Sequence, residues 1–189
     1  MTSTLKNCLR MIRPVIKKIQ AYHVADASGL VKLDAMENPY QLSDDLRARL
    51  QLELNKVQLN RYPDPSAESL RKKISIVMQV PASRSIVLGN GSDELIQMLA
   101  MAVADHDSKD VCLMSFDPGF VMYKMIADFV GIDYVGVSLQ QDFSLDMSAT
   151  RESIEKNQPA IIFIAYPNNP SANCYREADI EEIIGLAPG

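Results

Sequence analysis

Amide side chains follow directly on an apolar run near the end of the chain. Residues 160–165 read Ala-Ile-Ile-Phe-Ile-Ala, which predicts a strand, and residues 166–170 read Tyr-Pro-Asn-Asn-Pro. Ligands of open α/β sheets bind at the carboxyl edge of the strands, where this loop would lie. Pro170 favours extended backbone at Asn169 and so directs its carboxamide. The loop is predicted to contact a polar ligand, and for the loop alone a plain strand-to-helix connection is an equal alternative.

A glycine turn earlier in the chain has the residues of a phosphate site. Residues 85–88 predict a short buried strand, and Gly-Asn-Gly-Ser-Asp-Glu follows at 89–94, before an apolar helix. Free backbone amides at Gly91, Ser92 and Asp93, with the Ser92 hydroxyl, would form a phosphate cradle. The spacing matches neither the dinucleotide pattern nor the P-loop. Asp93 suits a ligand that carries a protonated ring nitrogen as well as a phosphate, or is simply an acid in the first helical turn.

Alternating strands and helices must position these residues. A helix capped by Ser43 and a second one after Pro63 and Pro65 are expected first. Four strand–helix pairs then follow, at 85–88 with 92–104, 111–115 with 119–130, 133–138 with 148–157, and 160–165 with 176–186. This order predicts an α/β fold with a mainly parallel sheet and helices on both faces.

Composition narrows the class of protein. The 189 residues carry a net charge of −5, which argues against a nucleic-acid surface, and no apolar run is long enough to span a membrane. Three cysteines without metal-ligand spacing are expected to be reduced, mostly buried thiols, and no metal site is predicted. The basic segment up to Gln20 is interpreted as an N-terminal arm that Pro14 interrupts; a membrane-surface helix is the weaker alternative. These features together predict a cytoplasmic enzyme.

Five segments in one order resemble a known family. They are Lys-Leu-Asp-Ala-Met-Glu-Asn-Pro-Tyr at 32–40, Arg-Tyr-Pro-Asp-Pro at 61–65, the glycine turn at 89–94, Pro-Gly-Phe-Val-Met-Tyr at 118–123 and the Asn-Asn-Pro loop. Together they resemble the fold-type I, pyridoxal-phosphate-dependent aminotransferases, and within them the histidinol-phosphate aminotransferase family. The resemblance implies an incomplete cofactor-binding large domain at 43–189, preceded by an arm and small-domain segment at 1–42.

The resemblance also implies roles for single residues. Gly91, Ser92 and Asp93 would hold the cofactor phosphate, and Phe120 would stack on the pyridine ring, where many relatives have tyrosine. Asn169 would donate to the phenolic oxygen of the ring. Tyr62 resembles a tyrosine that reaches the cofactor phosphate of the partner in a homodimer. For Phe120 a place in the core, and for Tyr62 packing between prolines, are the alternatives.

Other residues resemble the substrate side of the family's site. Tyr22 and Asn38 are the candidates there, although Asn38 before a proline is also typical of a plain turn. Two departures from the family pattern stand out. Met36 replaces a small polar residue, and Ala172 replaces a glycine, so that a positive φ at position 172 would strain the alanine by about 1 kcal/mol.

The family's catalytic residues would follow Gly189. By resemblance, the Schiff-base lysine, the aspartate on the pyridine nitrogen and a phosphate-binding arginine all lie further along, so the chain is expected to be an N-terminal part that is inactive alone. The preferred hypothesis is transamination between glutamate or 2-oxoglutarate and histidinol phosphate, a phosphorylated amino alcohol, in histidine biosynthesis. A threonine-phosphate decarboxylase-like enzyme, a noncatalytic phosphate-binding fragment and a truncated gene product are the alternatives.

Overall fold

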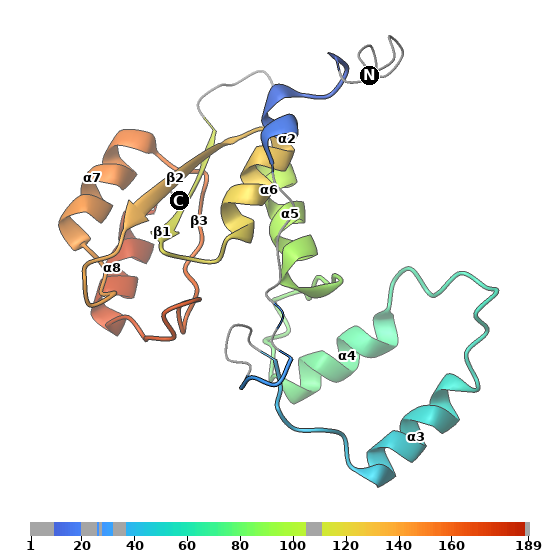
Figure 1. The fold of residues 1–189 in the computed structure, drawn as a ribbon. Helices are drawn as coiled ribbons and strands as arrows, with labels where there is room; N and C mark the ends of the chain where they lie inside the picture. The colour runs from blue at the N-terminus through green and yellow to red at the C-terminus, as the bar shows by residue number, and fades with distance from the viewer. Residues whose placement is uncertain (1–9, 20–25, 27, 32–36, 105–110, 188–189) are drawn as a thin grey trace. The chain divides into compact units, whose positions relative to one another are not determined.

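A computed structural model describes residues 10–19, 26, 28–31, 37–104 and 111–187. Its elements, in chain order, are α2 (Pro14–Lys18), α3 (Asp44–Leu54), α4 (Glu68–Val77), α5 (Gly91–Val103), β1 (Cys112–Asp117), α6 (Met122–Val130), β2 (Asp133–Ser138), α7 (Met147–Asn157), β3 (Ile161–Ile162) and α8 (Glu177–Leu186) (Figure 1). The chain divides into two compact units, of which one comprises Met1–Val24 with Gly89–Gly189 and the other Ala25–Leu88. The predicted domain boundary between residues 42 and 43 stays a prediction. None of the described helices is both long and apolar enough to span a bilayer.

The larger unit is built on a parallel sheet of three strands in the order β2-β1-β3. Strand β1 pairs along its whole length with β2, from Cys112 opposite Asp133 to Asp117 opposite Ser138. On its other side β1 pairs only with Ile161 and Ile162. The predicted strand at 133–138 has the expected bounds, whereas the strand predicted at 160–165 contains two residues. Beyond it the hydroxyl of Ser115 donates to the carbonyl oxygen of Phe163 at 3.0 Å.

Successive side chains of β1 point to opposite faces of the sheet, and each face has its own core. Leu113 belongs to a buried cluster with Ile96 and Ala100 of α5 and Tyr123 and Ile126 of α6. Met114 and Phe116, which point to the opposite face, belong to the second cluster, together with Val137, Leu145, Ile154, Tyr175 and Ile183. Figure 1 shows α5 and α6 on one side of the sheet and α7 and α8 on the other. The predicted α/β fold with helices on both faces is confirmed.

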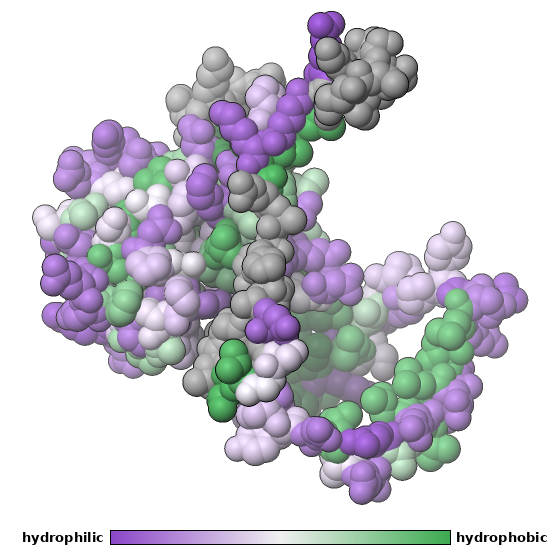
Figure 2. Space-filling model, in the orientation of Figure 1, coloured by the Kyte–Doolittle hydropathy of each residue, from purple (hydrophilic) through white to green (hydrophobic). Residues whose placement is uncertain are grey.

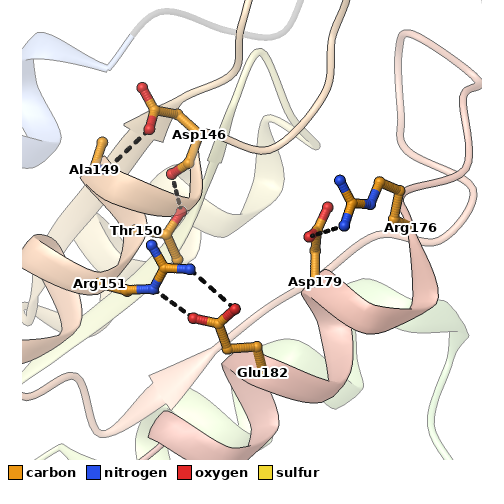
Figure 3. Close-up of polar contacts among 7 residues, drawn as sticks. All are labelled: Asp146, Ala149, Thr150, Arg151, Arg176, Asp179 and Glu182. Atoms are coloured by element: carbon orange, nitrogen blue, oxygen red, sulfur yellow. Dashed lines mark hydrogen bonds and ion pairs between the residues drawn. The ribbon is translucent and has the colours of Figure 1, made fainter.

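The two helices on the second face are fixed by polar contacts (Figure 3). Asp146 caps α7 by accepting from the amide of Ala149 at 3.0 Å. Arg151 of α7 donates to both carboxylate oxygens of Glu182 on α8, with 3.0 Å between Nη2 and Oε2. A capped start and a two-bonded ion pair therefore set the register of α7 against α8.

The unit Ala25–Leu88 contains α3 and α4, the two helices expected first in the chain. Ser43 caps α3 by accepting from the amide of Leu46 at 3.3 Å, as the sequence predicts. Neither helix buries a residue. Figure 2 shows apolar side chains on their surface, and Leu46, Leu54 and Val77 are each more than half exposed.

Two expectations for elements were wrong. No strand forms at 85–88, because no described backbone pairs with these residues, and Val87 is 67% exposed. Helix α6 begins at Met122 rather than at 119, after a tight loop. Pro14 interrupts the basic segment as expected: Arg10 is helical, residues 11–13 are not, and α2 begins anew at Pro14, since a proline needs no hydrogen-bond acceptor in the first helical turn. Arg13, just before it, donates to the carbonyl oxygen of Phe129 on α6.

Candidate functional site

The loop that leaves β1 is held close to its own strand. A Cβ atom at Gly119 would overlap the carbonyl oxygen of Phe116, so only glycine fits this position without a shift of the backbone. The next residue, Phe120, is half-buried and meets Tyr123 edge-to-face, with ring centroids 5.4 Å apart. Tyr123 in turn stacks on Phe163 at 4.8 Å. Phe120 therefore packs against the core at one side, as the core interpretation of this residue expected.

The loop that follows β3 is joined to the first loop by Asn168. This side chain is 3% exposed, and its Nδ2 atom donates to the carbonyl oxygen of Pro118 at 3.1 Å and to the Ser171 hydroxyl at 2.7 Å. Asn169, the residue that the sequence singled out, is half-buried, and its side chain has no hydrogen-bond partner among the described residues. The structure thus brings the loops that carry Phe120 and Asn169 together at the carboxyl edge of the sheet.

The first turn of α5 lies toward the same edge, because α5 runs antiparallel to β1 (Figure 1). Gly91 has a φ of +81°, and a Cβ atom there would meet nothing within 4 Å. Its backbone amide, which the sequence predicted to be free for a phosphate, donates instead to the carbonyl oxygen of Gly89 at 3.0 Å, in the turn that precedes α5. The backbone amides of Ser92 and Asp93 have no acceptor among the described residues, as is usual at a helix start. The amide of Asn90 donates to the Glu94 carboxylate of the same turn. An anion could therefore approach Ser92 and Asp93 through open space.

A polar pair that the sequence did not reveal lies beside the first loop. The Tyr134 hydroxyl of β2 donates to Asp117 at the end of β1, at 2.9 Å. Burial, followed by this bond and the negative charge of Asp117, raises the pKa of Tyr134. A Cβ atom at Gly136 would overlap the Asp117 carboxylate, so the glycine makes room for it. Strand alternation could have placed Asp117, Tyr134 and Gly136 on one face, but nothing in the sequence pairs them.

The remaining predicted site residues are not brought to this edge by any described contact. Tyr62 and Asn38 belong to the unit Ala25–Leu88, where Tyr62 is fully exposed. Asn38 accepts a hydrogen bond from the amide of Tyr40 at 3.0 Å, as in the plain turn named above as its alternative. Tyr22 and Met36 lie outside the described residues.

Sequence reasoning missed Asn168. It selected Asn169 because a proline follows it, and no signal in the Asn-Asn pair indicates which amide turns inward. Ala172 has a φ of +59°, the left-handed conformation that glycine adopts more easily. Cys112 is buried as expected, but Cys174 is exposed because it lies on this same surface loop.

This edge of the sheet offers a consistent set of groups to one kind of ligand. Two unpaired amides at a helix start suit a phosphate, an aromatic ring suits a flat heterocycle, and a free carboxamide suits a ring oxygen. A pyridine ring that carries both a phosphate and a phenolic oxygen has all three features. The residues present therefore fit pyridoxal phosphate.

The family model for aminotransferases of class I and II matches residues 28–188. The chain belongs to this family. The match includes all the elements that form the edge of the sheet described above, from the first turn of α5 to the loop after β3. It also includes α3 and α4 of the other unit.

Individual relatives agree with the family. The chain is 52% identical over 180 residues to "Histidinol-phosphate aminotransferase 2" of Cupriavidus pinatubonensis, covering 95% of this chain and 48% of that protein. It is 50% identical over 181 residues to a histidinol-phosphate aminotransferase of Thiocapsa roseopersicina, covering 95% of this chain and 94% of the relative.

A solved structure shares the fold. The histidinol-phosphate aminotransferase of Sinorhizobium meliloti, in complex with pyridoxal-5'-phosphate, superimposes with a TM-score of 0.74 at 15% identity, over 94% of this chain and 48% of that one. The chain thus spans about half the length of this structure and of the Cupriavidus relative.

Proposed function

We propose that the protein is a pyridoxal-phosphate-dependent aminotransferase that transfers an amino group between glutamate and imidazole-acetol phosphate, the keto form of histidinol phosphate. The observation that carries the proposal is the hydrogen bond from Asn168 to Pro118, since it unites the loops of Phe120 and Asn169 at one sheet edge. The sequence identity of 50–52% to proteins named histidinol-phosphate aminotransferase supports the choice of substrate.

The cofactor, when bound, supplies the electron sink for amino transfer, and the protein binds and orients it. The amides of Ser92 and Asp93, with the Ser92 hydroxyl, bind the phosphate at the positive end of the α5 dipole. Gly91, with its φ of +81°, turns the backbone into α5, and the space beside it is open. Phe120 covers the ring, and Asn169 donates its amide to the phenolic oxygen.

We further propose that the protein acts as a homodimer in the cytoplasm. Tyr62, on the fully exposed loop before α4, would contact the cofactor phosphate of the partner, and Asn38 and Tyr22 would contact substrate. The exposed apolar side chains of α3 and α4 support a partner surface, because their own unit does not bury them. The buried free thiol of Cys112 is consistent with a reducing compartment.

An amino-transfer assay tests the proposed activity. The protein is produced at the length that its gene encodes and incubated with glutamate and the keto form of histidinol phosphate, imidazole-acetol phosphate. We expect 2-oxoglutarate and histidinol phosphate in equal amounts, and only when pyridoxal phosphate is present. A parallel incubation with threonine phosphate is assayed for carbon dioxide. Release of carbon dioxide without amino transfer would replace the proposed reaction by a decarboxylation.

A further inference from the structure

Asn168 uses both hydrogens of its side-chain amide, one within its own loop and one to a segment that is distant in the sequence. A carboxamide nitrogen has two hydrogens, and the Nδ2 atom of Asn168 directs one to Pro118 and one to Ser171. Pro118 lies 50 positions away along the chain, whereas Ser171 belongs to the same loop as Asn168. The side chain is 3% exposed, so water cannot easily replace either partner. It is the only asparagine among the buried polar residues that the structure describes.

The backbone of the second loop holds Asn168 in place. Its amide donates to the carbonyl oxygen of Asn173 at 2.9 Å, and its own carbonyl accepts from Ala172 at 2.8 Å. The Ser171 hydroxyl, which accepts from Asn168, also donates to Oδ1 of Asn173. The loop therefore satisfies its own polar groups and leaves the second Nδ2 hydrogen of Asn168 for Pro118.

The first loop is held at both of its ends. Pro118 is fixed by Asn168, and Phe120 is fixed by the edge of the Tyr123 ring, with Gly119 pressed against Phe116 between them. Loss of the Asn168 bond would release Pro118, because no other described side chain donates to it. Phe120 would then be held only from the α6 side, by its ring contact with Tyr123 and by the hydrogen bond from the Tyr123 amide to its carbonyl oxygen.

We propose that Asn168 is a positioning residue that sets Phe120 and Asn169 as one unit. This inference rests on the proposed function, in which these two residues contact the same ring. Asn169 is covalently next to Asn168, and Phe120 follows two residues after Pro118, so a single amide fixes the distance between the aromatic and carboxamide contacts. The two contacts should therefore weaken together when Asn168 loses its donors.

Hydrogen exchange without ligand tests the junction of the loops. In the full chain, Asn168→Asp keeps the shape of the side chain but removes both donors. We expect amide exchange at residues 119–123 to rise about tenfold, as for loss of one ordinary hydrogen bond. Ser171→Ala, which removes only the oxygen that orients the amide, should give a smaller rise in the same segment. Asn157→Ala, which removes a carboxamide that bonds within α7, is the control and should leave it unchanged. Unchanged exchange at 119–123 in both loop variants would overturn the proposal.

A double-mutant cycle tests the coupling toward the ring. Equilibrium dialysis measures the affinity for pyridoxal phosphate in the parent, Asn168→Asp, Phe120→Leu and the double variant. If Asn168 acts through Phe120, the Phe120→Leu change should weaken binding less in the Asn168→Asp background than in the parent. The same change should keep its full effect in the Asn157→Ala background. Additive effects of Asn168→Asp and Phe120→Leu would overturn the coupling. A parent that binds no pyridoxal phosphate would instead overturn the proposed function, and the exchange result would still decide whether Asn168 joins the loops.

Discussion

Arg151 of α7 and Glu182 of α8 form an ion pair in which two guanidinium nitrogens donate to the two carboxylate oxygens (Figure 3). The hydrogen bond to Arg151 lowers the pKa of Glu182, and the same contact raises the pKa of Arg151. Both side chains are partly exposed, so salt screens the pair. Its geometry nevertheless links the two helices that cover one face of the sheet.

The acid stability of the protein should depend on this pair. Because the pKa of Glu182 is lower in the folded protein than in the unfolded one, its contribution is complete at neutral pH and is lost as the pH falls through the folded pKa. Glu182→Gln should therefore lower the urea midpoint of unfolding at pH 7. As the pH is lowered, the midpoint of this variant should fall less steeply than that of the parent. Glu181→Gln, one residue earlier on α8, is the control, because Glu181 forms no ion pair with any described residue. A parallel decline in the parent and Glu182→Gln would contradict the prediction.

Gly119→Ala should destabilise the fold and displace the loop that carries Phe120. The added Cβ atom would overlap the Phe116 carbonyl oxygen, and relief of such a clash costs about 1–3 kcal/mol. Gly185→Ala is the matched control, because a Cβ atom on α8 there meets nothing within 4 Å. It should stabilise the protein by about 0.5–1 kcal/mol. Urea denaturation measures the free energy of unfolding of both variants. Equal effects of the two changes would contradict the conclusion that Gly119 has no room for a side chain.

Ala172→Gly should stabilise the protein. The alanine has a φ of +59°, which costs an L-residue about 1–2 kcal/mol, and glycine removes this strain while losing some chain entropy on folding. We expect a net gain of about 1 kcal/mol in the free energy of unfolding. Ala178→Gly on α8 is the control, and it should lower the free energy of unfolding by about 1 kcal/mol, because glycine is a poor helix former. A loss of stability in Ala172→Gly would show that this conformation is not strained.

Ser92→Ala should modestly weaken the binding of pyridoxal phosphate. The hydroxyl is predicted to add one hydrogen bond to a phosphate that is held mainly by backbone amides. The substitution should therefore reduce the binding free energy by about 1 kcal/mol. Equilibrium dialysis measures it, with Ser148→Ala on the exposed side of α7 as the control. Equal affinities for the parent and Ser92→Ala would remove Ser92 from the phosphate site.

Mixed dimers would show whether Tyr62 acts on the partner. A Tyr62→Phe variant is mixed with a variant that lacks the Schiff-base lysine, both at the length that the gene encodes. If Tyr62 acts across the dimer, one hybrid site carries both lesions and the other carries none, so activity should reappear. Absence of activity after confirmed subunit exchange would place Tyr62 in the site of its own chain.

Much of the larger unit could be predicted, because strong local patterns determine it. The strand at 133–138 and the four helices from α5 to α8 follow apolar periodicity, and burial on both faces of the sheet agrees with that pattern. The failure at 85–88 has a physical reason. Three consecutive apolar residues, Ile86 to Leu88, form a strand only if another strand pairs with them, and pairing is a nonlocal property that the local pattern does not contain.

The site was predictable in its residue types but not in its contacts. The sequence correctly predicted a turn at the Asn-Asn-Pro segment, because prolines end the strand there, but it placed Phe120 inside a helix that in fact begins at Met122. It did not indicate that Asn168, rather than Asn169, turns inward, because both amides have the same local preferences. Nor could it pair Tyr134 with Asp117, because that contact depends on the register between β1 and β2.

The unequal pairing of β1 with its two neighbours implies an order of assembly. Strand β2 begins 21 positions after β1 and matches it over six residues, whereas β3 begins 49 positions after β1 and matches it over two. Closing the shorter loop costs less chain entropy and forms more of the ladder. We therefore expect β1, α6 and β2 to form the folding nucleus, with β3 docking afterwards. The two loops of the site would then meet only at the last stage of folding, so that a slow-folding variant could acquire its core before its ligand contacts.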